Sequence, residues 1–191
     1  MRTTSRVLTA LFAASLAACE RIQSTIEPDM AASVAPGAIV ASASGGGQYL
    51  LAGLFDGKFA FTANAKSDGS AIGEFRAWVD FGGVVADIHG RVTCLSVDET
   101  NGRAWIGAVI TSNTSTDPDL MDVIHQPGRD VWFRVLDAGE ARGAEDRLTF
   151  LGFEGAGGII TSAEYCEARI WPAGNARTHP VTSGNIQVRG T

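Results

Sequence analysis

The chain has 191 residues, with 15 lysines and arginines against 21 aspartates and glutamates, and its formal net charge at pH 7 is −6. This length is enough for one domain with a substantial hydrophobic core. An acidic chain without a cluster of basic residues is a poor partner for nucleic acid or for anionic lipid surfaces, so the composition argues against both kinds of partner.

The first eighteen residues have the pattern of an export signal. Arg2 and Arg6 precede an apolar run from Val7 to Ala18, which is shorter than the roughly 20 apolar residues needed to span a bilayer. A basic start, a short apolar stretch and small residues before a cleavage point are typical of a removable signal peptide. Removing residues 1–18 leaves 13 basic against 21 acidic residues, so the formal charge of the mature chain becomes −8.

The signal ends in Leu16-Ala17-Ala18-Cys19, which resembles the lipobox of bacterial lipoproteins. The resemblance implies a diacylglyceryl group on Cys19, cleavage before it, and acylation of the new amino group with a fatty acid such as palmitate. Because each buried methylene contributes about 0.8 kcal/mol, several acyl chains hold a protein on a membrane essentially permanently. The alternative is an ordinary signal peptide that ends near a cysteine.

This resemblance predicts a location in the cell envelope, with the membrane as a partner through the lipid on Cys19. Glu20 follows the cysteine, where an aspartate would favour retention in the inner membrane of enteric bacteria. The outer membrane is therefore the expected location if the host has two membranes.

The remainder of the chain divides into a tether and a domain. Residues 19–37 are polar and mixed and contain Pro28 and Pro36, so we expect them to form the tether. Strand signals begin near Ile39, and residues 38–191 are expected to form one all-β domain.

Alternating apolar and polar residues predict the strands of this domain. In one of them Ile88, Gly90, Val92 and Cys94 are expected to share a face. No segment has convincing helical spacing. The expected strands begin near residue 39 and continue at residues 58–65, 74–81, 88–94, 103–110, 131–137, 147–153, 165–171 and 186–189.

Short glycine-containing turns join the early strands, at Asp68-Gly69, Gly82-Gly83 and Asn101-Gly102, and such turns favour hairpins between sequential strands. A meander of this kind leaves two sheet edges, and closing the sheet on itself removes them. The sequence therefore predicts a single antiparallel up-and-down β-barrel of about eight strands, with a β-sandwich as the alternative.

Two cysteines remain when Cys19 is lipidated. A pair of cysteines in an exported protein is typical of a disulfide, so Cys94 and Cys166 are expected to be bridged. The alternative is two separate buried thiols. A metal pair is disfavoured because the sequence has no further cysteine or clustered histidine to complete the ligand set.

Four segments follow one another in an order that resembles a known domain. The match covers residues 45–190 and is with an uncharacterised domain of secreted and cell-surface bacterial proteins, often found beside choice-of-anchor modules. The resemblance implies a location and a fold, and no activity. The segments are Gly57 to Ala63, Val92 to Val97, Asn101 to Gly107 and Val131 to Glu140.

One loop concentrates carboxylates between two expected strands. Its acidic residues are Asp137, Glu140, Glu145 and Asp146. A flexible acidic loop can supply several of the six to eight oxygens that calcium prefers, so calcium is the one cofactor that the sequence suggests. The alternative is a solvated hairpin in which Arg142 and Arg147 pair with the acids and hold its shape.

Two further places carry candidate ligand-binding residues. In the stretch 111–128, His125 with Asp122 could act as an oriented base or join a metal site, or the stretch is simply a mobile loop. His89 and Arg91, on a polar strand face with Thr93, could line a groove for a polar or sugar-like molecule, or form the solvated side of the barrel.

The tryptophans fall on polar or secondary strand faces. Trp78, Trp105 and Trp132 could contact a ligand, a partner or a membrane surface. The alternative is a second layer of packing outside the main core.

No catalytic set stands out, so the favoured hypothesis is a non-enzymatic binding or structural module of the cell envelope. A carrier that holds a small molecule inside the barrel is a variant of this hypothesis. The alternative from a different class is an envelope enzyme that uses the loop around His125 and Asp122.

Overall fold

The computed structural model describes residues 35–140 and 144–190. The predicted signal peptide, Cys19 and all but the last residues of the tether lie outside the described residues. The strands are β1 (Ile39–Leu51), β2 (Phe55–Lys66), β3 (Ala71–Asp80), β4 (Val85–Asp98), β5 (Arg103–Asn113), β6 (Asp130–Leu136), β7 (Arg147–Thr149), β8 (Gly152–Phe153) and β9 (Thr178–Gly190), and the α-helix is α1 (Ser162–Ala168).

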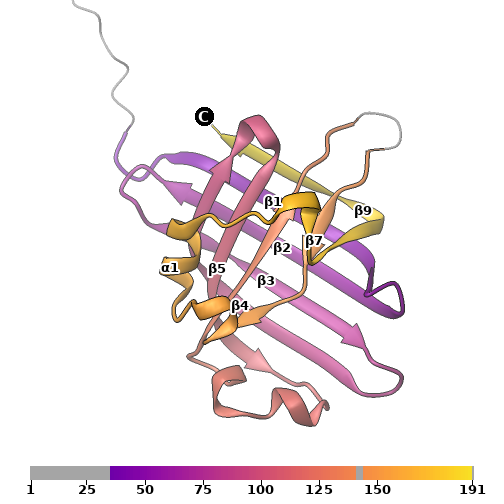
Figure 1. Ribbon diagram of the computed structural model, residues 1–191. Coiled ribbons are helices and arrows are strands. Elements are labelled where there is room, and N and C mark those ends of the chain that lie inside the picture. Colours follow the sequence, from indigo (N-terminus) through magenta and orange to yellow (C-terminus); the bar gives the residue numbers. More distant parts are fainter. Residues whose placement is uncertain (1–34, 141–143, 191) are drawn as a thin grey trace, which may run out of the picture. The chain divides into compact units, whose positions relative to one another are not determined.

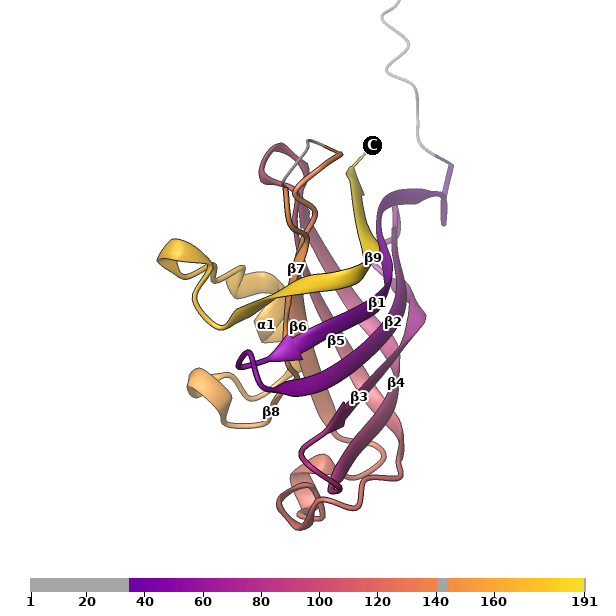
Figure 2. The ribbon, with the colours of Figure 1, turned by 90° about the vertical axis from the view of Figure 1, so that its right-hand side faces the viewer.

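The strands confirm the predicted barrel. Each strand from β2 to β7 pairs antiparallel with its predecessor, and β9 pairs with both β7 and β1. These pairings close an eight-stranded up-and-down barrel, and the two-residue strand β8 is an extra strand beside β6. Figures 1 and 2 show α1 and its flanking segments on the outside of this barrel.

Side chains fill the barrel interior. The inward positions of β2, β3 and β6 carry Phe59, Phe61, Phe75 and Phe133, all buried. The ring of Phe133 contacts those of Phe61 and Phe75 at centroid distances of 5.4 and 5.5 Å. The space left among these rings is about 10 Å³, which is about the volume that one water molecule needs. The interior is thus a packed core.

One predicted strand face is wrong, because β4 contains a bulge. Val92 pairs with Ala108 but Cys94 pairs with Gly107, so Thr93 is an extra residue in β4. A bulge shifts the alternation by one position. Leu95 therefore packs against the core, and Cys94 points out of the barrel rather than inward with Val92.

The prediction of a strand at residues 165–171 is also wrong, since α1 covers most of this segment. The helix begins with a capping box, in which Thr161 accepts from the backbone N–H of Glu164 and the carboxylate of Glu164 accepts from that of Thr161. This pattern of threonine followed three residues later by glutamate satisfies orphan N–H groups of the first turn. The sequence carries that signal, but the helix has only seven residues and no long periodic stretch.

The helix packs on the barrel wall and forms a second, outer core. Trp105 and Trp132 point outward from β5 and β6 and are buried beneath Tyr165 of α1. This arrangement is the second layer of packing that was the alternative for these tryptophans. Trp78 is different, because it lies half-buried on the open face of β3, with the ammonium of Lys58 4.9 Å from its ring centroid.

A disulfide between Cys94 and Cys166 joins α1 to β4 and confirms the predicted bridge. Gly107 makes the close approach of α1 possible. A Cβ atom at this position would lie 2.4 Å from Sγ of Cys94 and 2.8 Å from the carbonyl oxygen of Ser162. Any side chain larger than that of glycine would therefore push the helix off the barrel wall.

Candidate functional site

A groove of about 390 Å³ lies on the outside of the barrel, between β6 and the segments that flank α1. We call it the outer groove. Within the described ranges, none of the residues that line it is acidic. Its apolar walls include Trp132, Phe150, Leu151, Ile159, Tyr165 and Ile170, and its basic side chains are Arg134, Arg177 and His179.

The outer groove exists because the expected strand 147–153 is interrupted. The chain pairs with β6 as β7, leaves it at Phe150 and Leu151, and returns to it as β8. Where the ladder is broken, the backbone N–H of Arg134 donates to Oγ1 of Thr149 at 3.1 Å. This side-chain oxygen takes the place of the missing backbone acceptor, so the N–H of Arg134 stays paired and the groove stays open beside it.

Stacked aromatic rings form one wall. Trp132 and Tyr165 stack with a centroid distance of 5.6 Å and an interplanar angle of 22°. Burial raises the pKa of Tyr165 to about 12, although the nearby Arg134 guanidinium acts in the opposite direction. The Tyr165 hydroxyl is therefore neutral at pH 7 and able to donate a hydrogen bond.

Arg134 brings a buried positive charge to the groove, and its residue is only 8 % exposed. Its Nη2 donates to the carbonyl of Ala176 at 2.7 Å, and its guanidinium lies 5.4 Å from the ring centroid of Trp171. Nε of Arg134 has no hydrogen-bond partner among the described residues. A buried donor without an acceptor costs free energy, and the guanidinium brings its positive charge to the wall of the groove.

His179 adds a hydrogen-bond donor, and a backbone contact defines the tautomer of its ring. The backbone N–H of Ala52 donates to its Nδ1 at 3.3 Å, so the proton of the neutral ring resides on Nε2. Burial lowers the pKa of His179, and the charge of Arg147 adds to this effect. The ring is thus favoured in its neutral form.

The acidic loop organises the barrel rather than gathering its carboxylates into a cluster. Strand β7 pairs only with Thr178–Pro180 of β9. Beyond that point, aspartate side chains accept hydrogen bonds from backbone N–H groups of β9. Asp137 accepts from the N–H of Val188 at 2.9 Å, and Asp146 accepts from that of Ile186 at 2.6 Å. The other oxygens of these carboxylates accept from the N–H groups of Gly139 and Ala138.

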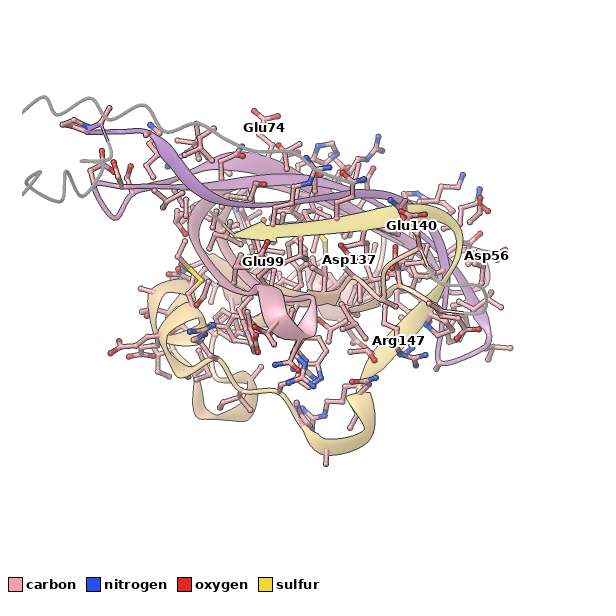
Figure 3. The ribbon with its side chains drawn as sticks, turned by 90° about the horizontal axis from the view of Figure 1, so that it is seen from above. Asp56, Glu74, Glu99, Asp137, Glu140 and Arg147 are labelled. Atoms are coloured by element: carbon pink, nitrogen blue, oxygen red, sulfur yellow. A yellow bond between two sulfur atoms is a disulfide. The ribbon has the colours of Figure 1, made fainter. Side chains whose placement is uncertain are left out.

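Seen from above, Asp137 lies beside β9, whereas Glu74 lies on the outside of the barrel (Figure 3).

The two glutamates of this loop take a smaller part in it. Glu145 lies 3.5 Å from Arg147 in a salt bridge, and Glu140 is exposed. Arg142, the other expected partner, lies outside the described residues. In the described part of the chain no three His, Cys, Asp or Glu side chains gather into a set that could hold a metal ion. A calcium site here stays a prediction.

His125 is buried against an aromatic ring and does not meet Asp122 through its side chain. Its imidazole packs edge-on against Phe153 at a centroid distance of 4.3 Å. Its Nδ1 has no hydrogen-bond partner within the described ranges, and its contact with Asp122 is a backbone hydrogen bond. A general base needs an orienting partner and a nearby nucleophile, and no such residue in the described part of the chain hydrogen-bonds Nδ1 of this ring.

His89 and Arg91 lie where the sequence placed them, on the outer face of β4. They pair across the sheet with Arg76 and Glu74 of β3. Asp87 binds the guanidinium of Arg76 at 2.9 and 3.0 Å and lies 3.4 Å from His89. The charges of Arg76 and Asp87 thus neutralise each other. Thr93 instead bonds to Ser162 of α1, so it does not belong to this face.

Comparison of the chain with protein-family models, with curated proteins and with solved structures finds no match in any of the three. Across residues 35–140 and 144–190, no helix has the length and apolar character needed to cross a membrane. The geometry of the outer groove and the sequence are therefore the basis for inferring a function.

The buried His125 and the half-buried His179 predict a loss of stability in mild acid. Burial lowers the pKa of both His125 and His179 below the ordinary value of 6.5, and for His125 the charges of Asp122 and Asp117 act in the opposite direction. Below about pH 6.5 the unfolded chain therefore binds more protons than the folded chain. The free energy of unfolding, measured by urea denaturation, should fall as the pH is lowered from about 7.5 to 5.5.

Replacing His125 and His179 with glutamine should flatten this pH dependence, whatever the substitutions do to the absolute stability. Ser183→Ala is the control, since it alters an exposed residue of β9 and removes no titratable group, and it should leave the slope unchanged. An equal slope in the wild type and the double variant would contradict the prediction.

Proposed function

We propose that this chain is a lipid-anchored, non-enzymatic module of the cell envelope that binds its ligand in the outer groove. The observation that carries the proposal is the contrast between the interior and the exterior of the barrel. The interior is filled by aromatic side chains, with about 10 Å³ left among them, whereas the groove outside offers about 390 Å³ between aromatic walls and basic side chains.

This contrast favours an external site over the carrier alternative. Barrels that carry small molecules hold them inside, in space that inward side chains leave free. Here Phe133 and its aromatic neighbours occupy that space. The surroundings of His125 likewise give no support to the enzyme alternative, because its ring contacts Phe153 and no orienting side chain.

The export signal and the lipobox resemblance support the anchored location. Replacing Cys19 with serine should abolish labelling of the protein with radioactive palmitate and release it from the membrane fraction. A variant such as Ser42→Ala, which alters an exposed-face residue of β1 outside the lipobox, should keep the label. Labelling of Cys19→Ser at the wild-type level would contradict the anchor.

The outer groove can be tested with a neutral aromatic probe. The full protein in phosphatidylcholine nanodiscs is titrated calorimetrically with 2-naphthylmethanol, and empty nanodiscs correct for partitioning into lipid. We expect saturable binding that Ala156→Phe weakens at least about tenfold, because Ala156 lines the groove and the added ring would occupy it. One factor of ten corresponds to about 1.4 kcal/mol.

Ala173→Phe is the matched control, since both alanines are exposed and both begin short 3-10 turns, but Ala173 does not line the groove. It should bind the probe like the wild type. No saturable binding, or equal binding by Ala156→Phe, would overturn the outer groove as the binding site.

A further inference from the structure

We infer that the ligand of the outer groove is an anion: a molecule that joins a flat apolar group to one acidic head group, a carboxylate or a phosphate. This inference rests on the proposed function and adds the chemical class of the ligand.

The charge of the groove favours an anion. The chain as a whole is acidic, with a formal charge of −6, yet Arg134 and Arg177 line the groove and no acidic residue does so among the described residues. The described part of the chain gives neither arginine a carboxylate within salt-bridge distance. Two guanidinium groups without counter-ions create a local potential that attracts an anion.

The polar side chains of the groove also favour an anion through their hydrogen-bonding character. Arg134 lines the groove, and an arginine can only donate. Because Nδ1 of His179 already accepts from Ala52, only the Nε2–H of its neutral ring is left to bind a ligand. The neutral hydroxyl of Tyr165 is a further donor. Groups of this kind complement a carboxylate or phosphate, which supplies acceptors only.

Arg177 adds a positive charge from a strained position of the backbone. Its φ is +65°, in the left-handed region that glycine adopts without steric cost and other residues rarely adopt. The backbone at this position therefore favours glycine, yet the chain carries an arginine here. That side chain is exposed at the groove, where its positive charge can reach the head group of a bound ligand.

The apolar part of the ligand follows from the opposite wall. Trp132 and Tyr165 stack face to face, and Gly152 lies so close that a Cβ atom there would be 2.4 Å from Nε1 of Trp132. The exposed side chain of Ile170 stands at the rim. A flat group can pack on these side chains while the arginines bind its acidic substituent.

The test compares probes that share a ring and differ in charge. The full protein in phosphatidylcholine nanodiscs is titrated with 2-naphthamide, 2-naphthoate and 2-naphthyl phosphate. Charge-assisted hydrogen bonds predict that the better anion binds about tenfold to a hundredfold more tightly than the amide. Tighter binding of the naphthoate identifies the head group as a carboxylate, and tighter binding of the naphthyl phosphate identifies it as a phosphate.

Variants locate the anion. Arg177→Gln should weaken binding of the better anion about tenfold and leave the amide unaffected, and since Arg177 is exposed the substitution spares the core. Arg189→Gln, which removes an exposed arginine of β9 away from the groove, is the control and should bind like the wild type.

The outcomes separate this inference from the proposed function. Equal binding of the amide and both anions, or anion binding that Arg177→Gln leaves unchanged, overturns the anionic ligand while the proposed groove stands. Absence of anion binding also overturns the inference, and the 2-naphthylmethanol titration then decides separately whether the outer groove binds at all.

Discussion

Phe133→Ala is expected to lower the free energy of unfolding by about 3–5 kcal/mol, the usual range for removing a buried aromatic ring. Phe133 lies inside the barrel on β6 and contacts Phe61 and Phe75, which belong to β2 and β3. Its ring thus joins opposite walls of the barrel. Because the neighbouring rings are held on rigid strands, they cannot collapse far into the cavity that alanine would leave.

Urea denaturation followed by circular dichroism measures this loss. Leu54→Ala is the control, because the Leu54 side chain is 72 % exposed, and its effect should stay within about 0.5 kcal/mol. A loss below about 1 kcal/mol for Phe133→Ala would mean that the barrel interior is not the packed core described above.

Removal of the disulfide is expected to cost about as much. Cys94 and Cys166 are 72 residues apart in the sequence, and in the chain-entropy model closing a loop of this length contributes about 4 kcal/mol. The double variant Cys94→Ala/Cys166→Ala should lose that amount in urea denaturation under oxidising conditions. It should still form the barrel, whose main core does not include either cysteine.

A reducing agent provides the internal control for this prediction. Dithiothreitol should destabilise the wild type by a similar amount and leave the double variant unchanged. If the double variant and the wild type unfold at the same urea concentration, the bridge does not contribute to the stability of the exported protein.

The barrel could be predicted from the sequence because alternation with a period of two is a local signal. Lys58 to Ala65 alternates in the same way in the sequence and in β2, where Phe59 and Phe61 point inward. The face of Cys94 could not be predicted in this way. It depends on the bulge at Thr93, which exists only through the pairing of β4 with β5. The prediction of the disulfide was nevertheless correct, because it followed from the cysteine count and the export signal.

The outer groove could not be predicted from the sequence. Arg134 sits inside the strand pattern of β6 and Arg177 precedes β9, more than forty positions later, so no local cluster of basic residues marks the site. Basic residues do not cluster along the sequence, but the fold brings Arg134 and Arg177 to the same groove. Trp132 was the one groove residue with a visible signal, since its large ring stands on the outward face of a strand.

The acidic loop has a structural role that the sequence does not show, while its calcium site stays a prediction. Asp137 and Asp146 stand out as a candidate calcium loop, yet in the structure their oxygens accept backbone N–H groups of β9 and of the loop itself. Nothing in the sequence indicates that β7 is too short to pair with this part of β9. The role of these carboxylates is legible only once the strand lengths are known.

The central claim is that this protein binds its ligand outside the barrel, in the outer groove. The most direct test is a two-dimensional nitrogen–proton NMR spectrum of the full protein in nanodiscs during titration with 2-naphthoate, followed at the indole N–H signals. We expect the signal of Trp132, which lines the groove, to shift saturably while that of Trp78, on the open face of β3, stays in place. A saturable shift of Trp78 with no change at Trp132 would contradict the claim.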